Sequence, residues 1–242
     1  MMPTPYGLFA AAGCVVAVLW LQRHREGIGV TENEFWAAMW AMLLGGIVGA
    51  KALYVALAWE HYAHGEISLW AEFGIGFVFF GGLVGALLAA VIFARVRRLD
   101  FLRGADYFAV AIPLGHAIGR IGCYYAGCCH GRDGHPVQLY ESAGLLLIAI
   151  ACRHALTMVE TGRWACGTAF CGYLVLYCGL RILLDPLRGD GRPERFLGIS
   201  HQQGIALLMI ASTAVWYRAR LHRPMEALED RRGSARRGSN MD

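Results

Sequence analysis

Apolar residues run along this chain in seven long blocks separated by short polar segments. The blocks cover residues 5–22, 35–58, 74–95, 105–121, 137–159, 166–185 and 201–218. Most of them approach the roughly 20 residues that a helix needs to cross a bilayer. A spanning segment must satisfy its backbone hydrogen bonds internally, so the pattern predicts an all-α, polytopic membrane protein with about seven transmembrane helices.

The composition agrees with this interpretation. Hydrophobic residues make up 57% of the chain and charged residues 17%, whereas soluble domains average about 25% charged residues. The apolar blocks are spread over the whole length, which argues against a soluble domain with a single anchor. We expect one transmembrane domain over residues 1–220 and a basic, disordered cytoplasmic tail over residues 221–242.

The arginines predict an orientation. They are frequent in the loops after the first, third and fifth helices and in the tail, whereas residues 59–72 contain no Lys or Arg. The positive-inside rule therefore places the N-terminus outside and the C-terminus in the cytoplasm. An exceptional group on the outer side indicates a functional site there: Arg120, Arg132, Arg188, Arg192 and Arg195.

Ionisable residues also occur within or at the edge of the predicted spans, where they are costly and usually serve a function. These residues are Lys51, Arg120, Glu141, Arg181 and Asp185. We interpret them as lining a wet cavity for a lipid headgroup, with purely structural ion pairs as the alternative. Arg181 and Asp185 are one helical turn apart, a spacing that allows them to pair.

Glycines recur at spacings of three and four residues in the second and third blocks. Such spacing lets membrane helices approach closely. We predict packing between these helices, with the alternative that Gly81 and Gly82 leave room for a lipid headgroup.

Three cysteines, Cys123, Cys128 and Cys129, follow the fourth block beside Arg120 and His130. Nearby positive charge is expected to lower the pKa of such thiols. Four interpretations stay open: a disulfide from Cys123 to one of the other two, unpaired structural thiols, a reactive nucleophile or acyl carrier, and a metal site that includes His130. The spacing Cys-x4-Cys-Cys-His is unlike that of usual zinc sites, so we assign no residue to a metal.

Seven segments, in order along the chain, together resemble the prolipoprotein diacylglyceryl transferase family. They are Tyr6-Gly7-Leu8; 45–51 with Tyr54; Gly81-Gly82-Leu83-Val84-Gly85; Gly119-Arg120-Ile121-Gly122; His135 to Glu141, an HPxQLYE segment; Tyr177 to Arg181; and Gly198-Ile199-Ser200 with Gln202 or Gln203. The resemblance covers most of the chain.

The resemblance implies a multi-pass enzyme of the bacterial inner membrane that moves a diacylglyceryl group from phosphatidylglycerol to the lipobox cysteine of a preprolipoprotein. Its partners are then phosphatidylglycerol and the signal-peptide region, with no soluble cofactor and no nucleic acid. By analogy Arg120 and Arg181 bind the phosphate, Tyr6 and Tyr177 position it, and Glu141 orients an arginine or lies near the donor. The substrate-binding set implied is Lys51, Gly81, Gly82, Gly131, His135, Gln138, Tyr140 and Tyr177.

The chain departs from the family pattern at some positions. Phe80 replaces the histidine of the HGG-type segment and cannot accept a proton. Cys123 and Cys128 occupy the places of an asparagine and an acidic residue, and we include both among the catalytic candidates. Only Asp133 and Gly134 separate Arg132 from His135 where the family has a longer insert. Two alternatives follow: a paralogue that uses another acceptor or a cysteine intermediate, and a non-catalytic lipid-binding or thiol-redox membrane protein.

Overall fold

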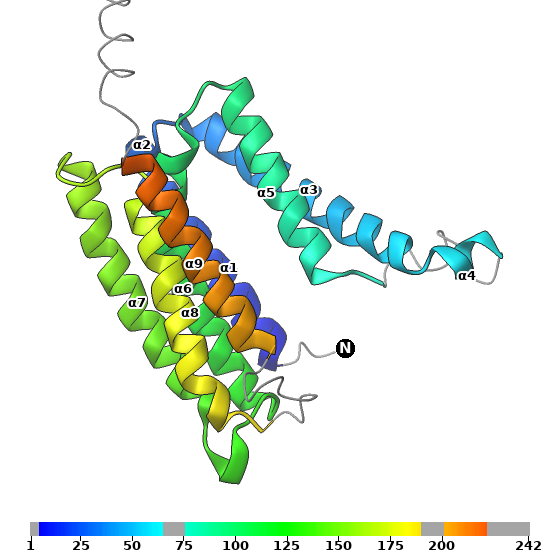
Figure 1. Cartoon of the computed structure of the whole chain (residues 1–242). Helices are drawn as coiled ribbons and strands as arrows, with labels where there is room; N and C mark the ends of the chain where they lie inside the picture. The colour runs from blue at the N-terminus through cyan, green and yellow to red at the C-terminus, as the bar shows by residue number, and fades with distance from the viewer. Residues whose placement is uncertain (1–4, 65–75, 190–200, 222–242) are drawn as a thin grey trace, which may run out of the picture. The chain divides into compact units, whose positions relative to one another are not determined.

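The computed structural model describes residues 5–64, 76–189 and 201–221 (Figure 1). The chain groups into two compact units, one of residues 1–17 with 109–242 and the other of residues 18–108. Each unit is described by itself. The predictions for the Gly198-Ile199-Ser200 segment, Arg192, Arg195 and residues 222–242 of the tail lie outside the described residues.

A long helix occupies each of the seven predicted blocks. The helices are α1 (Pro5–Arg23), α3 (Glu32–Leu57), α5 (Phe79–Val96), α6 (Phe101–Tyr125), α7 (Val137–Glu160), α8 (Thr168–Leu184) and α9 (His201–Leu221). Shorter elements are α2 (Arg25–Ile28), α4 (Trp59–Ala63) and the 3-10 turns η1 (Arg132–Gly134) and η2 (Asp185–Leu187). The described part of the chain contains no strand, which confirms the all-α prediction.

Within residues 5–64, 76–189 and 201–221, five helices are long and apolar enough to cross a membrane: α1, α3, α5, α7 and α8 extended by η2. Helices α6 and α9 are not among them. The bilayer also explains why large apolar side chains such as Leu147, Ile150 and Leu183 are exposed on the helix surfaces. A multi-pass membrane protein is therefore supported, while seven spans and the orientation of the termini stay predictions.

Local capping sets where two helices begin. The Thr31 hydroxyl accepts a hydrogen bond from the Glu34 backbone at 3.3 Å, and the Glu34 carboxylate accepts one from the Thr31 backbone at 3.0 Å. This capping box starts α3 three residues before the predicted start of the second block. The Asp100 carboxylate accepts hydrogen bonds from the backbones of Leu102 and Arg103 in the first turn of α6. Polar caps therefore extend both helices beyond their apolar blocks.

In the unit of residues 18–108, α3 and α5 run side by side (Figure 1) and meet through glycines. Gly45 lies against Gly85, and Gly49 against both Gly81 and Gly85, with backbone directly on backbone. An added Cβ at Gly81 would collide with the Gly49 oxygen. The packing prediction is thus confirmed for these glycines, and Gly81 has a structural role whether or not it also contacts a lipid.

In the other unit, α7 packs against α8, and α8 packs against α9. Helix α7 contributes the buried Leu145, Cys152 and Leu156 to this core. The Ser142 hydroxyl donates a hydrogen bond of 2.9 Å to the Ala117 carbonyl of α6. Helices α1 and α6 approach closely where Gly13 meets Gly115. These contacts hold the polar faces of α6, α7 and α8 together at one place.

We expect Gly85→Ala to lower the free energy of unfolding by about 1–3 kcal/mol. The added methyl group collides with the Gly45 backbone oxygen, which cannot swing away as a flexible side chain does. Gly46→Ala is the matched control, because its Cβ first meets the Gly82 oxygen at an ordinary 3.5 Å. Both changes add the same helix propensity, so it cancels in the comparison. Equal thermal unfolding temperatures for the two variants in detergent would contradict this packing.

Candidate functional site

A single buried carboxylate organises the polar site. Glu141 on α7 is 1% exposed. Its carboxylate oxygens lie 3.1 Å from Nε of Arg120 on α6 and 3.3 Å from Nη1 of Arg181 on α8. Nη1 of Arg188, which follows η2, donates a hydrogen bond to it at 3.4 Å. Three arginines, from α6, from α8 and from just after η2, therefore converge on one acid of α7.

The charges within this group of four residues do not cancel, because one carboxylate faces three guanidinium groups. His116 adds a further basic group, with Nε2 3.9 Å from the Glu141 carboxylate. Buried charges are costly unless they are paired and hydrogen-bonded. An arrangement with this excess of cations is suited to receive an anion.

Arg120 shows most clearly where an anion would bind. It is only 7% exposed, and its buried Nη2 has no hydrogen-bond partner among the described residues. Its Nε is close to Glu141 at 3.1 Å, but the angle does not make a hydrogen bond. Buried polar atoms in proteins are normally satisfied. The unused donors of Arg120 match the oxygens of a phosphate, which arginine binds through its planar fork.

Aromatic rings line the α8 side of the cluster. The Tyr177 ring lies 5.8 Å from the His116 ring and stacks on the Tyr173 ring at 5.9 Å, centroid to centroid. Tyr177 is half-buried beside Arg181, one turn away on α8, as the resemblance implies for a headgroup-positioning residue. Tyr140 is exposed, with its ring 6.3 Å from the ring of the exposed His135.

The loop after α6 positions Arg188. The Gly131 backbone donates a hydrogen bond of 2.9 Å to the His135 carbonyl, and Gly131 forms an isolated bridge with Arg188. The Gly189 backbone donates to the His130 carbonyl at 3.2 Å. A Cβ on Gly131 would lie 2.7 Å from the Leu187 carbonyl oxygen, so only glycine allows this approach. Gly131, predicted to bind substrate, therefore brings the Arg188 segment to the site.

Gln138 on α7 binds the same loop, the one that follows α6. Its side-chain nitrogen donates a hydrogen bond of 2.7 Å to the Cys128 carbonyl, and the residue is 2% exposed. Its side-chain oxygen is buried without a partner among the described residues. The glutamine of the HPxQLYE segment thus fixes the cysteine loop and retains one free acceptor.

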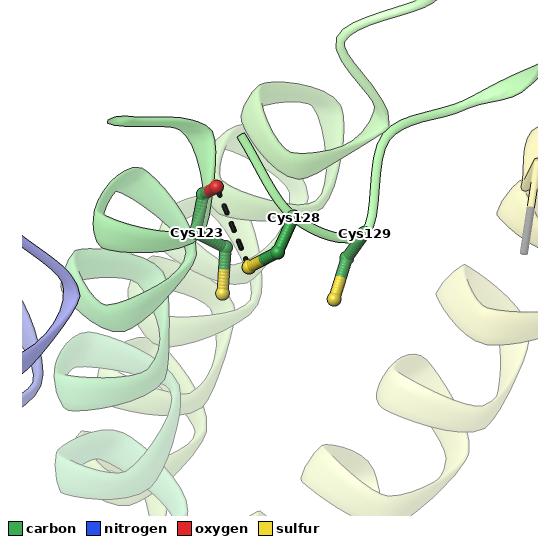
Figure 2. Close-up of side chains that lie close together, drawn as sticks. All are labelled: Cys123, Cys128 and Cys129. Atoms are coloured by element: carbon green, nitrogen blue, oxygen red, sulfur yellow. Dashed lines mark hydrogen bonds between the residues drawn. The ribbon is translucent and has the colours of Figure 1, made fainter. Parts of the chain in front are cut away.

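The three cysteines come together at the end of α6, as Figure 2 shows. Their sulfur atoms all lie within 4.8 Å of one another. The Cys128 thiol donates to the Cys123 carbonyl at 3.6 Å, and Nη1 of Arg120 donates to the Cys123 sulfur at 3.7 Å. All three are free thiols in the structure, so the disulfide predicted as one alternative is not formed here.

The pKa of the Cys128 thiol is raised, chiefly by desolvation and then by the neighbouring Cys123 and Cys129 thiols. The expectation that nearby cations lower the pKa is therefore wrong for Cys128. Arginine reaches Cys123 instead, while Cys128 faces other sulfur atoms that disfavour a second negative charge.

The other predicted site residues lie elsewhere in the chain. Tyr6 is exposed on α1. Lys51, Gly81 and Gly82 belong to the unit of residues 18–108, where Nζ of Lys51 lies 5.1 Å from the centroid of the Tyr54 ring. Phe80, at the position of the family histidine, is 67% exposed.

Two residues of the cluster were absent from the predicted site set. The sequence signal for Arg188 is its place among the outer-side arginines, which are an exception to the positive-inside rule. The sequence signal for His116 is its position one helical turn before Arg120, on the same helix face. Burial around Glu141 is what joins both residues to the site.

We expect Glu141→Ala to lower the free energy of unfolding by about 3–5 kcal/mol, because it leaves buried guanidinium groups without their shared partner. Glu160→Gln is the control, since its pair with Arg153 is exposed and worth about 0–1 kcal/mol. Thermal unfolding in detergent distinguishes them. A Glu141 variant as stable as the control would show that the cluster does not depend on this carboxylate.

Because a raised pKa leaves less thiolate at a given pH, Cys128 is expected to react with maleimide more slowly than a free cysteine peptide at pH values around the ordinary thiol pKa. The midpoint of its rate should lie at higher pH, and Cys129→Ser should lower it. Peptide mass spectrometry in the presence of a chelator follows Cys128 separately. A midpoint pH for Cys128 at or below that of the peptide would contradict the raised pKa of its thiol.

Comparison with known proteins adds an independent finding. The family model described as prolipoprotein diacylglyceryl transferase matches residues 4–218. Relatives named phosphatidylglycerol–prolipoprotein diacylglyceryl transferase include one from Clostridium tetani, 27% identical over 85% of this chain and 88% of its own length. One from Bacillus cytotoxicus is 28% identical over 85% and 84%, and one from Dehalococcoides mccartyi 25% identical over 92% and 91%. The chain, with its arginine cluster around Glu141, belongs to the prolipoprotein diacylglyceryl transferase family.

Proposed function

We propose that this protein transfers the diacylglyceryl group of phosphatidylglycerol to the lipobox cysteine thiol of a preprolipoprotein. Family membership and the names of the relatives support the transferase activity. The observation that carries the proposal in this chain is the buried Arg120 donor without a partner, within a group of three arginines around one carboxylate.

The reaction needs cations where the phosphate leaves. The acceptor sulfur attacks the carbon of the diacylglyceryl group that is bonded to the phosphate oxygen. A carbon–sulfur bond forms as this carbon–oxygen bond breaks. The electron pair of the broken bond leaves with glycerol phosphate, and the thiol gives up its proton. Arg120 and Arg181 are placed to hold the phosphate oxygens and to stabilise the charge on the leaving group.

Glu141 then has a positioning role. It holds the guanidinium groups of Arg120, Arg181 and Arg188 within one site. The three cations repel each other, and the shared negative charge of Glu141 offsets part of this repulsion. A prearranged group of cations need not reorganise when negative charge develops on the phosphate.

The proton of the acceptor thiol needs another base in this chain, since Phe80 cannot take it. His116 is the candidate that the geometry supports, because its imidazole lies 3.9 Å from the Glu141 carboxylate and next to the Tyr177 ring. We assign the acceptor-side proton transfer to His116.

The location follows from the substrates. Phosphatidylglycerol and a signal-peptide region both reach the site from a bilayer, which fits the apolar helices of this chain. We place the protein in the bacterial inner membrane, with the N-terminus outside and the C-terminus in the cytoplasm.

Arg120→Ala is expected to reduce transfer of labelled diacylglyceryl from phosphatidylglycerol to a lipobox peptide by about 10²–10³-fold, the loss typical of removing one donor to a developing anion. The purified chain is assayed in detergent, with glycerol phosphate release followed in parallel. Arg153→Ala, which removes an exposed arginine paired with Glu160, is the matched control and should keep full activity.

Other outcomes of this assay are also informative. Glycerol phosphate release with label on the protein would overturn the proposed acceptor in favour of a cysteine intermediate. A folded Arg120→Ala variant that still forms both products as the wild type does would contradict the phosphate role of Arg120. A folded wild-type chain that binds lipid and forms neither product would refute the catalytic proposal.

A further inference from the structure

The cysteine loop is a built cluster of three sulfur ligands that the transfer reaction does not require. Cys123 belongs to the last turn of α6, and Cys128 and Cys129 to the loop that follows (Figure 2). In this view the Cys128 side chain is directed toward Cys123, and the three sulfur atoms lie within 4.8 Å of one another. The residues range from the buried Cys123 to the exposed Cys128.

This separation is close to what one metal ion requires. With zinc–sulfur bonds of about 2.3 Å, three sulfur ligands around one ion lie roughly 4 Å apart. Small rotations of the side chains therefore suffice to bring all three to one centre. A disulfide uses only two of these sulfur atoms and leaves the third beside it.

The backbone holds the cluster in place before any ion arrives. Gln138 binds the Cys128 carbonyl at 2.7 Å, and the Cys128 backbone donates to the Cys123 carbonyl at 3.2 Å. Cys129 has a φ of 57°, in the left-handed region that a side-chain-bearing residue rarely adopts. With Cys129 in this conformation, the sulfur atoms of both consecutive cysteines lie within 4.8 Å of the Cys123 sulfur.

We propose that Cys123, Cys128 and Cys129 form a three-thiolate site for a thiophilic d10 cation of the Zn²⁺ or Cu⁺ class. Soft thiolates select such ions over Mg²⁺ or Ca²⁺. Binding is an exchange without redox chemistry, in which three thiols release three protons and form three metal–sulfur bonds. His130, considered with the cysteines on the basis of the sequence, is outside the sulfur group.

Arg120 offsets the charge that such a site creates. Three thiolates around a divalent ion carry one net negative charge, and Nη1 of Arg120 donates to the Cys123 sulfur at 3.7 Å. The exposed Cys128 provides a way in for the ion, and three protein ligands leave a fourth position open to water. The spacing in the sequence argued against a metal because adjacent ligands are awkward, and the left-handed Cys129 removes that difficulty.

The test measures binding to the full-length chain in detergent, reduced with a phosphine and kept free of oxygen. Titration with Cd²⁺ is followed by thiolate-to-metal absorbance, and bound Zn²⁺ is counted by elemental analysis after gel filtration. We expect one ion per chain. Cys123→Ser, Cys128→Ser and Cys129→Ser should each weaken binding at least about tenfold, since even partners outside the ligand shell contribute about 10–100-fold. Cys14→Ser, which alters an exposed thiol on α1, is the control and should bind like the wild type.

A second measurement avoids dependence on the folding of the variants. Bound Cd²⁺ should protect Cys123, Cys128 and Cys129 of the wild-type chain from alkylation, while Cys14 stays reactive. Neither readout uses lipid or peptide substrate, so failure here is distinguishable from failure of the proposed transferase function. Three results would overturn the site. One is an unchanged number of bound ions when Cys123, Cys128 and Cys129 are all replaced by serine. The others are no binding by the reduced wild-type chain and a disulfide at Cys123 in acid-trapped cells.

Discussion

The arrangement of α6, α7 and α8 depends on one carboxylate that pairs with several guanidinium groups. Glu141 is buried where it meets Arg120, Arg181 and Arg188, and burying these guanidinium groups would cost more without its negative charge. The carboxylate thereby fixes the distance between helices that are otherwise held by apolar contacts. It also leaves the group cationic, so that structural stability and anion recognition depend on the same contact.

Several segments that carry the family resemblance also support one another physically. Gln138 and Glu141 lie one turn apart on α7, and one holds the cysteine loop while the other holds the arginines. Gly131 brings the Arg188 segment against that loop. The HPxQLYE segment, which the resemblance gives as substrate-binding, therefore also positions the arginines and the cysteine loop.

The cysteine loop brings three thiols together beside the arginine group, at positions where the resemblance leads us to expect other residues. Cys123 and Cys128 stand where the family has polar residues, next to Arg120. Cations and soft ligands are therefore neighbours at the end of α6, joined by the contact between Arg120 and the Cys123 sulfur. An ion bound there would lie beside the proposed phosphate site without occupying it.

Much of the fold was predictable because membrane helices are specified by local hydrophobicity and caps. The seven apolar blocks and the close-packing glycines of α3 and α5 acted through neighbours a few residues away or through a simple periodicity, whereas the Thr31 capping box, which begins α3 before its apolar block, was not among the predictions. Arg120, Arg181 and Glu141 were recognisable as candidates because charge in a spanning segment is costly. Which charges share a partner was decided only by tertiary structure, since Glu141 meets Arg188 across 47 positions and the Cys129 backbone conformation depends on the loop around it.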